Sequence, residues 1–420
     1  MNARPDLLEA SGEPPLMSER RTSLIGAMLV ALGPFSLALF TPAMPEIVRA
    51  FGTTEAAVKM TLSLYFAGFA FAQLICGPMS DGFGRKPVTY FFIGIYVLAS
   101  LVALISPNIE TLILARFLQG VGAAVGVAVS RAIVRDLFTH ERSARIMNLI
   151  GMILAIGPAV APTLGGLTME LAGWHAIFAL MLAAGIGIVL IVHFCMRETV
   201  ERDLSRIRPG ALLKSYATLT RSGYFMLSSL VVAGSAGALY SLATVLPFIL
   251  MGRAGLSPAQ FGIGMLAQSG MYFMGSVAVR FLMPRVGASM LVPVGLVFIG
   301  VGSLAVALSL GLVPPSFMSV MAPVGLYAFG IAFVMPAMMT ASLAPFPRMA
   351  GSASSMMGFL QMGAGLVGGS FTALIGDPVL GMMIVIPALG ATAIVSWLIW
   401  RRLPEPTLAT AMRPNPPGPA

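Results

Sequence analysis

The sequence has little charge. Only 10% of its 420 residues are Asp, Glu, Lys or Arg, whereas soluble domains carry roughly a quarter. In contrast, 57% of the residues are hydrophobic and the mean hydropathy is +0.91. A water-soluble fold would have too few polar residues to cover this much apolar surface. The composition therefore excludes an ordinary soluble domain and favours an integral membrane protein.

Cysteine is also scarce, and recognisable catalytic motifs are missing. Cys76 and Cys195 both lie in apolar runs, which argues against a disulfide framework or a metal site. The sequence contains no HExxH motif, no nucleophile elbow, no P-loop and no paired carboxylates inside an apolar run. We therefore expect no catalytic residues, no metal and no cofactor, and a protein that is not an enzyme.

Long charge-free runs are abundant, and a helix needs about 20 apolar residues to cross a bilayer. Between Glu110 and Arg131 lies a run interrupted only by Arg116, and 286–347 is long enough for two helices. Nine further runs are 22–45, 60–80, 87–109, 146–169, 171–196, 222–252, 254–279, 349–376 and 378–400. Because backbone groups in lipid must be satisfied within the segment, the runs predict an all-α integral membrane protein with twelve transmembrane helices.

A polar, Arg-rich segment divides these helices into six plus six. We expect this linker at 197–221, between six-helix bundles at 22–196 and 222–402, with disordered tails at 1–21 and 403–420. The two halves also resemble each other at an offset of roughly 208 residues, a pattern typical of transporters whose site lies between two repeats.

The positive charge is distributed unevenly. The net charge is +9, and twelve helices with both termini inside would place 21 of the 25 Lys and Arg residues on the cytoplasmic side. This positive-inside bias orients a multi-pass protein in the cytoplasmic (inner) membrane. We therefore expect lipid and a small molecule as partners, no nucleic acid, and a monomer.

One short loop between apolar runs has a distinctive pattern. Gly77, Asp81, Gly84, Arg85 and Lys86 form G-x-x-x-D-x-x-G-R-K. Asp81 can reach Arg85 and cap a helix N-terminus, where the helix dipole favours an anion. Any cytoplasmic loop can carry Arg and Lys for topology alone, but the full pattern resembles the signature loop of the major facilitator superfamily.

Two further segments strengthen this resemblance. Residues 115–124 are similar to the family's helix-4 motif, and 157–166 to the helix-5 motif associated with its exporters. Over roughly 40–180 the chain resembles the bicyclomycin-resistance-type drug efflux branch. The helix-5 motif combines glycines that permit close helix packing with prolines that bend the span, namely Gly157, Pro158, Pro162, Gly165 and Gly166.

The resemblance also assigns roles to charged residues. Asp136 would join Asp81 and Arg85 in a charge cluster that acts as a gate at the signature loop and stabilises the outward-facing state, although it could also be a solvated loop acid. Arg116 lies inside a span, so it should face a wet cavity unless it snorkels to the outer interface. Gln119 lies on the same helix face, three residues on.

Polar side chains at mid-span are few, and we expect them to line a substrate cavity. The set is Tyr65, Arg116, Gln119, Tyr240, Gln268, Tyr272, Tyr327 and Gln361. Each of these residues is equally suited to a hydrogen bond between helices. The 30 methionines are mostly core filler, although flexible side chains also suit a promiscuous apolar pocket.

In the resembled branch an aspartate precedes the Pro-x-x-Pro segment of helix 1, but here its place falls at Ala38. The nearest acid is Glu46, so Glu46 and Arg116 are the candidates for proton coupling. We predict a secondary transporter that exports small, largely apolar or cationic compounds, as in multidrug or antibiotic efflux, by proton antiport with alternating access. The alternatives are an exporter or facilitator of a defined metabolite (sugar, nucleoside or amino acid) without proton coupling, and a membrane scaffold or sensor.

Overall fold

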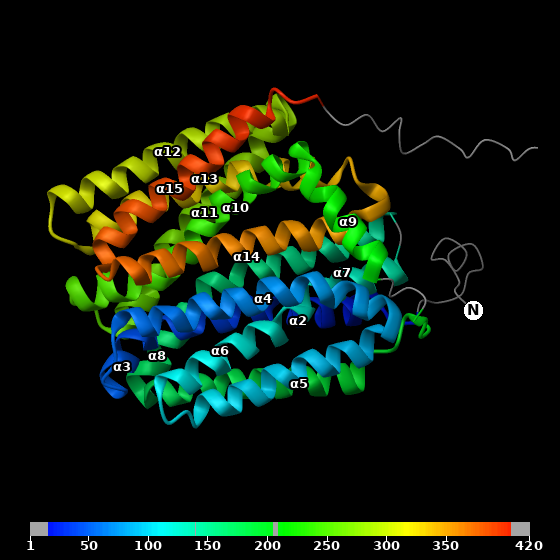
Figure 1. Cartoon of the computed structure of the whole chain (residues 1–420), viewed down its shortest axis with the longest axis horizontal. Helices are drawn as coiled ribbons and strands as arrows, with labels where there is room; N and C mark the ends of the chain where they lie inside the picture. Colours follow the sequence, from blue (N-terminus) through cyan, green and yellow to red (C-terminus); the bar gives the residue numbers. More distant parts are fainter. Residues whose placement is uncertain (1–15, 139, 205–208, 405–420) are drawn as a thin grey trace, which may run out of the picture.

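The chain folds into long helices that run side by side along one axis (Figure 1). The computed structural model describes residues 16–138, 140–204 and 209–404, and this part of the chain contains no strand. Most of the predicted tails at 1–21 and 403–420, and residues 205–208 of the predicted linker, lie outside the described residues. The predicted all-α membrane fold is confirmed.

The first half contains helices that are broken at defined points. α6 and α7 form one span that is interrupted at Ala124, and α8 is broken at Gly173, where φ is 76°. The helices are α2 (Glu19–Phe40), η1 (Thr41–Ala43), α3 (Met44–Ala50), α4 (Glu55–Phe83), α5 (Arg85–Leu104), α6 (Ile109–Ala123), α7 (Val125–Leu137) and α8 (His140–Cys195).

The second half follows a short connecting helix, α9 (Pro209–Arg221). Its helices are α10 (Gly223–Pro247), η3 (Phe248–Arg253), α11 (Pro258–Val286), α12 (Ala288–Leu312), α13 (Phe317–Leu343), η4 (Pro347–Met349), α14 (Ala350–Ile375) and α15 (Pro378–Trp400). In Figure 1 the first half (blue to green) lies below the second half (green to red).

Ten stretches of the described residues are long and apolar enough to cross a membrane. They include a single stretch, Ala159–Cys195, from α8, although Gly173 divides that helix into two segments. α11 is not among the ten, because Gln268 and Arg280 lower its hydropathy, but it runs for 29 residues alongside the others. With α8 divided and α11 included, the helices account for twelve spans.

Small polar residues begin most spans. The side chains of Ser18, Thr54, Asn108, Ser222 and Asp377 each accept a hydrogen bond from a backbone N–H of the first turn. Such caps satisfy N–H groups that the helix itself leaves unpaired. The sequence therefore marks its helix starts with side chains that pair the backbone where the chain enters the bilayer.

Each half supplies most of one apolar core, and two helix pairs make the main contacts between the halves. Buried residues of α2–α8 form most of one cluster, to which Ala243 and Phe248 of the second half also belong, and those of α10–α15 form most of another. Between the halves, α4 packs on α14 and α8 packs on α11. We name the two ends of the bundle by their turns: the Gly84 end, where α4 meets α5, and the Gly376 end, where α14 meets α15.

Candidate functional site

The signature loop is a tight turn at the Gly84 end. α4 ends at Phe83 and α5 begins at Arg85, and Gly84 between them has φ 102°. The carboxylate of Glu198 accepts hydrogen bonds from the backbone N–H groups of Arg85 (2.8 Å) and Lys86 (2.9 Å). A Cβ at Gly84 would lie 2.8 Å from this carboxylate, so a larger residue would displace the Glu198 side chain, and the positive φ also favours glycine.

The loop's charged residues meet as the resemblance implies. Arg85 is 3% exposed and forms ion pairs with Asp81 (2.5 Å) and Asp136 (2.9 Å), while Thr199 also donates to Asp136 (2.9 Å). Asp136 is therefore not a solvated loop acid. Asp81 pairs with Arg85, but the acid at the N-terminus of α5 is Glu198, which the sequence analysis does not single out.

The remaining loop residues connect neighbouring helix ends. Lys86 donates from Nζ to the carbonyl oxygens of His193 (3.0 Å) and Met196 (2.9 Å) at the C-terminus of α8. A cation at the C-terminus of a helix pairs with the terminal carbonyls and interacts favourably with the helix dipole. Gly77 faces Ser355 of α14, so the loop region also touches the second half.

The helix-5 motif lies on the seam between the halves. A Cβ at Gly166 would lie 2.2 Å from the carbonyl oxygen of Pro258, and one at Gly262 would lie 2.3 Å from that of Pro162. α8 and α11 therefore cross with their backbones in direct contact near the Gly376 end, and Thr163 donates to the Gly262 carbonyl (3.0 Å).

Three of the five motif residues thus lie at close contacts. Gly165 approaches the carbonyl oxygen of Leu39 on α2, and Gly166 and Pro162 lie on the seam with α11. Gly157 has open space where a Cβ would be. The side chain of Pro158 lies outside the described residues.

Arg116 is the most unusual residue in the spans. Its side chain is fully buried. The guanidinium carbon lies 4.4 Å from the ring centre of Phe40 and 4.5 Å from that of Tyr65. A desolvated cation–π contact contributes about 2 kcal/mol or more. Arg116 therefore does not snorkel to an interface but is enclosed between aromatic rings.

A hydrogen-bond network fixes one end of the guanidinium. Nη1 of Arg116 donates to Oε1 of Gln119 (2.7 Å), and Nε2 of Gln119 donates to Ser100 (2.8 Å). The sulfur of Met181 lies 3.8 Å from Nη1. The hydroxyl of Tyr65 donates to the carbonyl of Gly33 on α2 (2.9 Å). Tyr65, Arg116 and Gln119 thus form one cluster; that they line a substrate cavity, as the sequence analysis expects, stays a prediction.

An aromatic contact connects this cluster to the second half. The rings of Tyr65 and Phe66 lie 6.3 Å apart, and Phe66 lies 5.4 Å from Tyr240 of α10. Gln361 of α14 donates to the Tyr240 hydroxyl (3.4 Å). The predicted cavity residues of both halves therefore meet where α4, α10 and α14 pack together.

The other predicted cavity residues make different contacts. Tyr327 is fully buried and donates to the carbonyl of Gly234 (3.2 Å), so its hydroxyl joins α13 to α10 instead of facing a cavity. Gln268 and Tyr272 lie on α11, and Oε1 of Gln268 is buried without a partner among the described residues. Glu46 lies in α3 near the Gly376 end, 2.8 Å from Arg49 and 37% exposed.

The sequence analysis misses Lys59, a fully buried cation of α4 at the Gly376 end. Its ammonium donates to the carbonyl of Gly376 (3.2 Å), lies 3.6 Å from the Glu55 carboxylate and lies over the ring of Phe248. These contacts join α4 to α14 and η3 in the other half. No sequence signal distinguishes Lys59 from an exposed loop lysine, since the pairing spans 317 residues.

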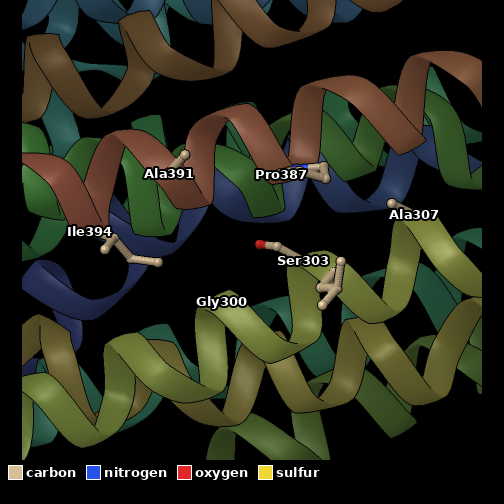
Figure 2. Close-up of a pocket in the computed structure, with 7 residues that line it drawn as sticks. Gly300, Ser303, Ala307, Pro387, Ala391 and Ile394 are labelled. Carbon is tan, nitrogen blue, oxygen red and sulfur yellow. The ribbon is translucent and has the colours of Figure 1, made fainter.

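A pocket lies elsewhere, between α12 and α15. It has a volume of about 230 Å³ and a largely apolar lining. Figure 2 shows the Ser303 hydroxyl directed into the space between these helices, with Pro387 and Ala391 on the facing helix. None of the predicted cavity residues lines this pocket.

Comparisons with known proteins agree with this architecture. The multidrug resistance protein MdtL of Salmonella typhimurium is 30% identical over 402 residues, covering 93% of this chain and 97% of the relative. The bicyclomycin resistance protein homolog of Haemophilus influenzae is 28% identical over 360 residues, covering 82% and 87%.

A solved structure shows the same fold. The crystal structure of a D-xylose-proton symporter superposes with a TM-score of 0.72 at 13% identity, covering 92% of this chain and 98% of that one. Residues 26–369 match the sequence profile of the Major Facilitator Superfamily, over both halves and across the signature loop, the Arg116 cluster and the helix-5 seam. The chain is therefore a transporter and a multi-pass inner-membrane protein, and it belongs to the Major Facilitator Superfamily.

Proposed function

We propose that this protein exports small, largely apolar compounds, including antibiotics, by alternating access between its two halves. The observation that carries the proposal is the seam of α8 and α11, where Gly166 and Gly262 let the backbones of the two halves touch near the Gly376 end. Relatives named for multidrug and bicyclomycin resistance support drug efflux as the outcome. A substrate site then lies between the halves, near Tyr65, Phe66 and Tyr240.

In this proposal the Gly84 end faces the cytoplasm. α2 begins at this end and α9 ends there, and both carry basic residues at that point, among them Arg21 and Arg221. Arg85 and Lys86 of the signature loop lie at the same end. The positive-inside rule places such an end in the cytoplasm, and with it both chain termini.

At the Gly84 end the halves are joined by polar contacts. Arg131 of α7 donates to Ser354 of α14 (2.5 Å). Tyr216 of α9 donates to the carbonyl of Leu74 on α4 (2.7 Å), and burial raises the pKa of the Tyr216 hydroxyl to about 12. This phenol therefore remains a donor at neutral pH. We propose that the halves move as units, connected by α9.

We also propose that protons drive export, since net transport against a gradient needs an energy source. Among the described residues, carboxylates lie only toward the ends of the spans. Glu46 is paired with Arg49, whereas Oε2 of Glu55 is buried beside Lys59 without a hydrogen-bond partner in the described chain. Cationic substrates, which the sequence analysis includes, find no fixed counter-charge at mid-span.

The test is expression in a bacterial strain that lacks its main efflux pumps. Wild-type protein should raise the inhibitory concentration of several neutral apolar antibiotics, and Gly166→Leu, which separates the seam, should not. Fluorescent-dye uptake into everted vesicles, with and without a collapsed proton gradient, then tests the coupling. No rise for any compound of a broad panel would refute drug export, and uptake that persists without the gradient would refute proton coupling.

A further inference from the structure

Arg116 has two guanidinium nitrogens without a partner. Nη1 is bound to Gln119, but Nε and Nη2 have no hydrogen-bond partner among the described residues, although the side chain is fully buried. A buried donor without a partner carries an uncompensated desolvation cost. This arrangement therefore calls for a ligand that supplies acceptors.

The two free nitrogens lie on the same edge of the guanidinium. Nε and Nη2 are the pair that binds both oxygens of a carboxylate in two parallel hydrogen bonds. Gln119 holds the opposite corner of the group, and the rings of Phe40 and Tyr65 contact its carbon at 4.4 and 4.5 Å. The fork is thus held in one orientation with its carboxylate-binding edge unused.

The charge balance points to the same ligand. Arg116 makes no ion pair within the described residues. Its guanidinium instead contacts the neutral amide of Gln119 and two aromatic rings. The ion pairs of this half lie at its ends, for example at Arg85 and Lys59. A cation that is enclosed away from water without an anion is costly, so an anionic group that enters is favoured.

We propose that Arg116 binds the carboxylate of a small amphiphilic compound whose apolar or aromatic body lies against Phe40 and Tyr65. The protein thereby accepts carboxylate-bearing substrates in addition to neutral ones. That the compound is transported rests on the proposed function, whereas its binding does not. The same edge could hold chloride, so the experiment includes chloride as a separate arm.

The experiment measures binding to the purified full-length protein by thermal-shift titration. Sodium benzoate and benzamide share an aromatic ring, but benzoate carries a carboxylate and benzamide a neutral amide. Sodium chloride is titrated separately at constant ionic strength. Wild-type protein should bind benzoate about tenfold or more tightly than benzamide, because only the carboxylate uses both free nitrogens.

Two variants test the residue. Arg116→Lys retains a cation but removes the fork, and Gln119→Glu supplies an internal carboxylate beside Nη1 that neutralises the guanidinium. Both should reduce the preference for benzoate to about one. Gln119→Glu preserves side-chain shape, so it remains informative if Arg116→Lys fails to fold. Arg49→Lys, the same change at an exposed surface pair, is the matched control and should retain the preference.

Three results would overturn the proposal: equal binding of benzoate and benzamide, a preference that survives in Gln119→Glu, or a shift that chloride alone reproduces. The readout does not depend on export. A protein that fails to confer drug tolerance but prefers benzoate retains this site and loses only the proposed function.

Discussion

The two halves contain the same turn but use it differently. Gly84 joins α4 to α5 with φ 102°, and Gly287 joins α11 to α12 with φ 81°. Beside Gly84 the carboxylate of Glu198 fills the space that a Cβ would need, whereas nothing lies within 4 Å of a Cβ at Gly287. The backbone geometry is thus shared by both halves, while the acid that caps the following helix is present only in the first.

Buried charge follows the same division. Lys59, Arg85 and Arg116 of the first half are at most 3% exposed, whereas each described Arg side chain of the second half is exposed. At the offset of roughly 208 residues, Arg116 corresponds to Val324, a fully buried core residue. Among the described residues, the buried basic side chains therefore lie in the first half, and the second half packs against it mainly through apolar and small polar residues.

The largest loss of export should follow substitutions in the seam, to which each half contributes one closely packed glycine. Gly166→Ala and Gly262→Ala each place a Cβ less than 2.5 Å from a backbone carbonyl oxygen, so α8 and α11 must separate. Overpacking of this kind costs about 1–3 kcal/mol, and we expect export to fall to about a tenth or less in either variant, measured as dye transport in vesicles.

Gly157→Ala is the control for the seam, because nothing lies near a Cβ at that position. It should leave export intact. A strong loss of export in only one of the two seam variants would contradict the equal contribution of the two glycines.

The next effect compares the twin turns. Gly287→Ala should lower the free energy of unfolding by about 1–3 kcal/mol, because a positive φ is unfavourable for alanine. Gly84→Ala should cost about 1 kcal/mol more, because it also displaces Glu198 and its two backbone hydrogen bonds. Denaturant unfolding of the purified protein measures both values.

The extra cost at Gly84 should disappear in a Glu198→Ala background. If Gly84→Ala and Gly287→Ala are equally destabilising in the otherwise unchanged chain, Glu198 is not the distinguishing feature of the first half.

A smaller effect is expected at Lys59. Lys59→Met retains the apolar stem but removes the hydrogen bond to the Gly376 carbonyl, so the Gly376 end should open more often. One lost hydrogen bond contributes about 0.5–1.5 kcal/mol, which corresponds to a several-fold change in population. Labelling of Ser63→Cys, a buried position on α4, by a membrane-impermeant maleimide should speed up accordingly. Unchanged labelling would show that Lys59 does not hold the halves together.

The smallest effect should be that of Glu46→Gln. Glu46 forms a partly exposed pair with Arg49, and such pairs contribute about 0–1 kcal/mol. Export should retain its rate and its pH profile in vesicles. A variant that loses only the pH-dependent part of export would instead make Glu46 the proton carrier.

Local patterns in the sequence predict the helices and the ion-pair cluster at the signature loop well. Apolar runs about 20 residues long locate the spans, and the signature loop correctly brings Asp81, Arg85 and Asp136 together. Arg116 is recognisable because a charge inside an apolar run is costly, and its partner Gln119 lies three residues away on the same helix.

Contacts between distant segments are harder to predict. Glu198 lies 113 residues from the backbone N–H that it caps, and Lys59 lies 317 residues from the carbonyl that it binds. A single sequence offers no period or spacing that relates such pairs. Tyr327 is a failure of another kind, because a mid-span tyrosine suits a cavity and a helix-to-helix hydrogen bond equally, and the fold uses it for the bond to Gly234.

Reversible locking of the Gly376 end tests the central claim most directly. Glu170 accepts a hydrogen bond from the Ala259 backbone across the seam (3.1 Å). With Cys76 and Cys195 replaced by serine, Glu170→Cys and Ala259→Cys place two thiols across the seam, to be joined by oxidation or by a short crosslinker that a reductant cleaves. The proposal predicts that oxidation stops export and that a reductant restores it. Full export by completely crosslinked protein would contradict it.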